Sequence, residues 1–86
     1  MKAVYNLIQL YKLDSGEISV HVDTYATKYA AEDALEHETT EILLEIIDND
    51  AQVLSDERGE LNAVIIDSNN NAYELSIELS AIKEAI

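Results

Sequence analysis

Residues 27–48 read TKYAAEDALEHETTEILLEIID and separate two segments in which apolar and polar residues alternate. Thr24 or Thr27 can cap the amino end of a helix here, because a threonine hydroxyl accepts a bond from a free backbone N–H of the first turn. The apolar residues recur at the spacing of one helical face, at Ala31, Ala34, Leu35, Ile42, Leu43, Ile46 and Ile47. The pattern predicts one long helix from about Thr27 to Asp48.

The segment before this helix predicts a β-hairpin. Ala3–Leu13 carries apolar side chains on both faces, which is typical of a strand covered on two sides. Asp14-Ser15-Gly16 is a turn signal, since glycine adopts a positive φ without strain. In Glu17–Thr24, apolar and polar residues alternate strictly, which indicates a half-buried strand.

The segment after the helix predicts a second hairpin. Leu61–Asp67 has the composition of a strand, an asparagine-rich turn follows, and Tyr73–Leu79 alternates with polar residues. Residues 80–86 are expected to form a short terminal helix. Residues 50–59 fit three structures: an extension of the long helix, a second short helix, or a loop; in each case Gly59 ends the element.

These elements predict a single α+β domain over residues 1–86, in the order strand-strand-helix-strand-strand. The simplest packing is a four-stranded antiparallel sheet (ββαββ order) with one long acidic helix on one face.

Composition restricts the cellular setting and the partners. The chain has 86 residues, no cysteine, and 18 acidic against 5 basic side chains, for a net charge of −13. A domain of this size without disulfides is expected in the cytoplasm. The charge predicts no direct binding to nucleic acid and none to an anionic membrane; the favoured partner is a basic protein surface.

The excess charge is concentrated in residues 32–60, which hold eleven acids and one base, Arg58. Carboxylates three and four residues apart lie on one side of a helix, where like charges repel. One interpretation is a surface that imitates nucleic acid; the other is a solvated helix face that keeps the protein soluble. The candidate partner-binding residues are Glu38, Glu41, Glu45 and Asp48, with Asp50, Asp56 and Glu57.

No arrangement of residues predicts catalysis, a metal or another cofactor, so the chain is expected not to be an enzyme. It has no cysteine and no glycine-framed serine, and its two histidines, His21 and His37, are isolated. The segment from Asp67 to Glu78 resembles a calcium-binding loop, but Ala72 stands where that loop needs glycine. An ordinary turn is the favoured interpretation.

The first strand offers a second candidate contact. Tyr5, Leu7 and Tyr11 share one of its faces, and Val4, Ile8 and Leu10 share the other. One face is expected to meet the helix. The other is expected to contact a second subunit or a target through tyrosine, which is enriched at interfaces, unless the rest of the chain folds over it.

In its size, its lack of cysteine and its acid-loaded helix, the chain resembles the nucleic-acid-mimicking inhibitors encoded by bacteriophages and mobile elements, among them anti-CRISPR and anti-restriction proteins. The residues that carry this resemblance run from Glu36 through Asp48 to Glu60. The resemblance implies inhibition without catalysis or cofactor, by blocking a basic nucleic-acid-binding protein. The alternative is a generic small protein-interaction or dimerisation module that is acidic for solubility.

Overall fold

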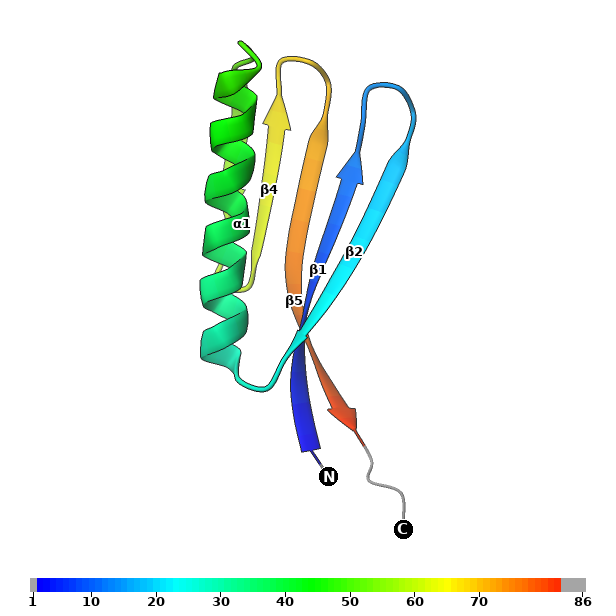
Figure 1. Ribbon diagram of the computed structural model, residues 1–86, viewed down its shortest axis with the longest axis vertical. Helices are drawn as coiled ribbons and strands as arrows, with labels where there is room; N and C mark the ends of the chain where they lie inside the picture. The colour runs from blue at the N-terminus through cyan, green and yellow to red at the C-terminus, as the bar shows by residue number, and fades with distance from the viewer. Residues whose placement is uncertain (1, 83–86) are drawn as a thin grey trace.

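The computed structural model describes residues 2–82 and shows one helix packed against a five-stranded antiparallel sheet (Figure 1). The α+β class is therefore confirmed. The strands lie in the order β2-β1-β5-β4-β3. Along the chain the elements are β1 (Lys2–Lys12), β2 (Ile18–Tyr25), α1 (Lys28–Asp48), β3 (Val53–Arg58), β4 (Asn62–Asp67) and β5 (Ala72–Ile82).

The turn between β1 and β2 fixes the register of the first hairpin. The backbone N–H of Leu13 donates to the carbonyl of Glu17 at 2.9 Å, and Gly16 has a φ of 89°, which favours glycine. The turn sets Lys12 opposite Ile18, and β5 pairs with β1 on its other side, with Leu7 opposite Ile77. Because side chains alternate along each strand, these pairings decide which residues share a face.

The prediction of four strands is wrong, because part of the segment 50–59 forms β3. This strand pairs with β4 at the edge of the sheet. Its register shifts between Val53 and Ser55, so the alternation that normally marks a strand is interrupted. The strand ends in three charged residues, Asp56, Glu57 and Arg58, as is common where an edge must resist pairing with other chains.

The predicted helix over residues 80–86 is also wrong in its first part. Ser80 and Ala81 belong to β5, which pairs along the whole of β1, with Val4 opposite Ser80. This long pairing satisfies backbone groups that a helix would have satisfied internally. Residues 83–86, the rest of the predicted helix, lie outside the described residues.

A single core lies between α1 and one face of the sheet. Leu7 and Ile65 are fully buried there, and the core comprises Leu7, Ala31, Leu35, Ile42, Ile46, Ala63, Ile65, Leu75 and Ile77. Figure 1 shows α1 running beside β4, while the β1–β2 hairpin extends away from the helix. The strand β1 was expected to be covered on two sides, but within residues 2–82 only one face of the sheet carries a helix.

We expect Leu7→Ala to lower the free energy of unfolding by about 2–5 kcal/mol, because it removes buried methyl groups and leaves a cavity beneath the helix. The shift of the urea denaturation midpoint measures the loss. Leu44→Ala is the matched control, since Leu44 is 52% exposed and its loss is expected to cost less than about 0.5 kcal/mol. Equal losses in the two variants would contradict the assignment of Leu7 to the core.

Candidate functional site

The helix α1 begins and ends at well-defined caps. Thr27 has extended backbone angles, and its hydroxyl accepts a hydrogen bond from the backbone N–H of Ala30 at 3.1 Å, as the sequence predicts. At the other end the N–H of Asn49 donates to the carbonyl of Glu45, and Asp50 takes a φ of 58°. The helix therefore holds its side chains in fixed positions over 21 residues.

The four helical carboxylates of the predicted site lie along one flank of α1. We call Glu38, Glu41, Glu45 and Asp48 the acidic ridge. The helix buries Ala31, Leu35, Thr39, Ile42 and Ile46, so the ridge lies to one side of that buried stripe. Glu38 is half-buried and the other three are exposed. The geometry thus brings these four predicted residues together.

Two members of the ridge, Glu38 and Glu45, lie near tyrosines of the central strands β1 and β5. The pKa of Tyr11 is raised to about 12, mainly by burial and then by the nearby carboxylates of Glu38 and Glu45. The pKa of Tyr73 is raised by burial first, then by Asp67 and Glu45. These effects place Glu38 and Glu45, but not the exposed Glu41 and Asp48, close to the tyrosines of β1 and β5.

A tyrosine pair supports the sheet beneath the ridge. The rings of Tyr11 and Tyr73 meet edge to face, with centroids 5.0 Å apart. The hydroxyl of Tyr11 donates to Oε1 of the buried Gln9 at 2.6 Å. Tyr5 and Tyr11, both predicted as partner contacts, pack against the core on the face that α1 covers. Sequence reasoning missed Tyr73 and Gln9. Tyr73 comes opposite Tyr11 only when β5 pairs with β1, and Gln9 shares the face of Tyr11 on β1.

The structure separates the remaining predicted residues from the ridge. Asp50 lies in the exposed turn directly after α1. Asp56 is in β3, at the far edge of the sheet, and accepts two hydrogen bonds from Arg58, at 3.0 and 3.3 Å. Glu57 follows on the same strand and, since side chains alternate, points to the opposite face of the sheet. Asp56 and Glu57 therefore do not extend the ridge.

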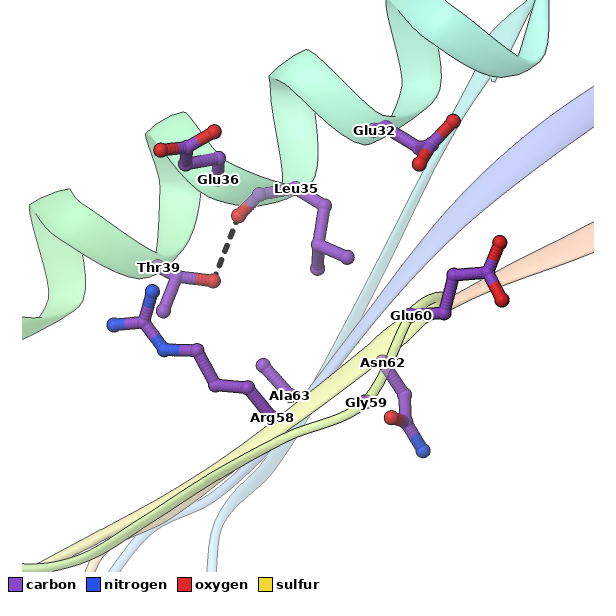
Figure 2. Close-up of a pocket in the computed structure, with 9 residues that line it drawn as sticks. All are labelled: Glu32, Leu35, Glu36, Thr39, Arg58, Gly59, Glu60, Asn62 and Ala63. Atoms are coloured by element: carbon purple, nitrogen blue, oxygen red, sulfur yellow. Dashed lines mark hydrogen bonds between the residues drawn. The ribbon is translucent and has the colours of Figure 1, made fainter.

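The other flank of α1 borders a small open cleft of about 230 Å³ beside β3 and β4 (Figure 2). Leu35 points into it from the helix, and Arg58 reaches from β3 toward Thr39. The pKa of Arg58 is raised mainly by its hydrogen bonds with Asp56, and Glu36 adds to this. At this volume the cleft is smaller than the usual small-molecule pocket of about 300–1,000 Å³.

The segment that resembles a calcium-binding loop forms a turn in which the Asp67 carboxylate accepts hydrogen bonds from the turn itself. Asp67 is buried, and its carboxylate accepts hydrogen bonds from the backbone N–H groups of Asn69 and Asn71 at 2.9 and 3.0 Å. Asn70 adopts a φ of 64°, which asparagine tolerates. Glu78 points to the other face of the sheet, so it does not join Asp67. Within residues 2–82, no three His, Cys, Asp or Glu side chains gather as metal ligands.

The two histidines are exposed, and each lies beside a carboxylate. Nε2 of His21 is 3.1 Å from Asp23, and Nε2 of His37 is 4.0 Å from Glu41. Neither is part of a wider cluster of ligands among the residues that the structure describes.

Comparisons of this chain with protein-family models, with curated proteins and with solved structures give no match. The described part of the chain contains no helix long and apolar enough to cross a membrane.

The half-buried Tyr11 predicts a loss of stability at alkaline pH. A tyrosine whose pKa is raised on folding contributes stability that is present below its ordinary pKa of 10 and lost as the pH rises toward about 12. We expect the urea midpoint to fall across this window, and to fall less steeply in Tyr11→Phe. Tyr29→Phe is the control, because Tyr29 is 81% exposed. Identical slopes in the natural chain and Tyr11→Phe would contradict the burial of this hydroxyl.

Proposed function

We propose that this protein is an acidic inhibitor that binds a basic nucleic-acid-binding protein through the acidic ridge and excludes nucleic acid from it. The observation that carries the proposal is a row of four carboxylates on one flank of a capped helix. Within residues 2–82 the only ion pair of the ridge is a long contact between Glu41 and His37, at 4.0 Å. The negative charge of the row is therefore hardly neutralised by basic side chains of the described chain.

The geometry of the row supports binding to a phosphate-binding surface. A helix rises about 1.5 Å per residue, so the ten steps from Glu38 to Asp48 span about 15 Å, with one carboxylate per about 5 Å. One DNA strand carries a phosphate per about 3.4 Å of helix axis. The two spacings are of the same order, so Lys and Arg side chains placed to bind phosphates can reach several of these carboxylates.

Energetics also favours a role for the row beyond folding. Like charges three or four residues apart weaken a helix by about 0.2–0.5 kcal/mol per pair. A helix selected for stability alone would place Lys among these Glu residues, yet α1 has a single Lys and no Arg; this Lys28 pairs with Glu60 at 3.2 Å. The opposing interpretation, an acidic face that serves solubility alone, requires neither a row nor a capped helix.

The proposed mechanism is competition without chemistry. Each exposed carboxylate contributes under about 1 kcal/mol to binding, because solvent screens it. Together the carboxylates steer the encounter with a basic partner and fix its orientation. Binding should weaken as salt shortens the Debye length, which is about 8 Å at physiological ionic strength.

We expect the triple variant Glu41→Lys, Glu45→Lys, Asp48→Lys to abolish capture of basic nucleic-acid-binding proteins from a bacterial lysate by the immobilised chain. Duplex DNA should displace the same proteins from the natural chain, and graded salt should elute them. The fold should survive, because reversing the three charges relieves repulsion along the helix.

The matched control reverses three carboxylates outside the ridge and outside the opposite face of the sheet: Asp14→Lys, Glu17→Lys, Asp33→Lys. All three residues are exposed, and the control changes the net charge by the same amount. It should keep most of the binding. If the two triple variants bind alike, the ridge is only part of a general negative field, and the proposed function is wrong.

A further inference from the structure

The face of the sheet opposite α1 is rich in exposed apolar side chains. The pairing of β1 with β2 puts Ile8 beside Val22 and Leu10 beside Val20 on this face. On β4, two more apolar residues, Val64 and Ile66, lie on the same face, since Val64 is opposite Glu74 and Ile66 opposite Ala72. We call this surface the open face; its apolar members are Val4, Ile8, Leu10, Ile18, Val20, Val22, Val64 and Ile66.

Several of these side chains are far more exposed than strand residues of their type usually are. Ile18 is 63% exposed, Val20 60%, Val22 51% and Ile66 38%. The sequence predicts that the alternation in β2 buries this apolar set, yet the register of the hairpin turns it away from the helix. Ile8, Leu10, Ile18, Val20 and Val22 adjoin one another across β1 and β2, whereas Ala72, Glu74 and Ser76 of β5 separate them from Val64 and Ile66 on β4. Exposed apolar side chains grouped in this way are typical of an interaction site.

Charge distinguishes the open face from the rest of the molecule. Among the described residues its charged side chains are Lys2, Lys12, Glu57, Glu74 and Glu78, which leave one net negative charge out of a total of −13. The central acid, Glu74, is neutralised by Lys12, with Nζ and Oε2 3.1 Å apart. Nearly all of the excess negative charge therefore lies on the helix side and at the edges.

We propose that the open face binds a second copy of this chain, so that two sheets stack face to face. Two molecules each carrying −13 repel one another, and the open face is the one broad surface of the described chain on which they can meet with little charge between them. The same contact places the two acidic ridges on the outer sides of the dimer. This proposal does not depend on the proposed function of the ridge.

The area of the open face is sufficient for a stable dimer. When the axis of the dimer lies between β1 and β5, four strands of each sheet overlap: β2, β1, β5 and β4. At about 4.8 Å between strands and about 3.3 Å per residue over about nine residues, these strands make a face of about 19 by 30 Å. Two such faces cover about 1,100 Å², above the roughly 1,000 Å² that a specific interface needs. Stacked sheets lie about 10 Å apart, a distance that aliphatic side chains fill from both sides.

The shape of the open face is also complementary to the open face of a second copy. A shallow hollow runs along β5, where Ser76 lies between Ile8 of β1 and Asn62 of β4. A two-fold axis parallel to the strands and passing between β1 and β5 would set β1 of each copy over β5 of the other. Ile8 and Leu10 would then enter the hollow of the partner, as an isologous interface requires.

Sedimentation equilibrium of the full chain tests the proposal, with Val20→Lys on β2 and Ile66→Lys on β4 as variants. The natural chain should be a dimer at micromolar concentration, and each variant should weaken the dimer at least about tenfold, since a buried unpaired charge is costly. Each substitution also lowers the repulsion between copies, so any loss of dimer comes from the apolar contact itself.

The control is Ser19→Lys, which adds the same charge to the opposite face of β2 and should leave the dimer intact. Raising the salt concentration should strengthen the dimer by screening repulsion, whereas it should weaken binding by the ridge, so failure of one proposal is distinguishable from failure of the other. A natural chain that is monomeric at about 100 μM overturns the proposal. A dimer lost in Val20→Lys but kept in Ile66→Lys also overturns it, because pairing along the β2 edge explains that result.

Discussion

The contact between α1 and a single face of the sheet is the constraint on which the rest of this structure depends. One helix of 21 residues provides the whole cover for five strands, and the core consists of what lies between them, with Leu7 and Ile65 at its centre. A domain of this size buries little surface to begin with, so nearly all its stability must come from this one layer. The contact leaves two surfaces exposed: the rest of the helix and the opposite face of the sheet.

The first consequence concerns charge. Because α1 has only one stripe in contact with the sheet, its remaining surface is free to carry acids, and it does so on both flanks. On one flank Glu36 lies near Arg58, which is itself hydrogen-bonded to Asp56; on the other, burial and then the nearby Glu38 and Glu45 raise the pKa of Tyr11. The flank without a basic neighbour is the one that keeps its field available to a partner.

The sequence predicts the helix, its cap at Thr27 and both hairpins, since each rests on local rules of spacing and turn chemistry. It does not predict β3, because the register shift after Val53 breaks the alternation and the strand is held by its partner β4 rather than by its own pattern. Nor does alternation alone say which side of β2 is buried. That choice is made at long range, when Leu7 meets Ile77 of β5, seventy residues away, and Val20 is turned outward as a result. The ridge was predictable from helical spacing, but the separation of Asp56 and Glu57 from it depends on the same long-range pairing.

The two proposed surfaces lie on opposite sides of one sheet, and this arrangement has its own physical consequence. A face-to-face dimer would present two acidic ridges in fixed orientation, on outer surfaces separated by both sheets and both cores. Each ridge alone is a weak, screened contact, because exposed ion pairs are worth little. Two ridges held rigidly together bind a target with two basic sites as one unit, since the second contact forms at high effective concentration. On these two proposals, a chain of 86 residues, too small to build a large interface by itself, gains binding strength from its own duplication. The open face and the ridge are in this sense complementary: the nearly neutral side is the proposed contact between copies, and the charged side is left for the proposed partner.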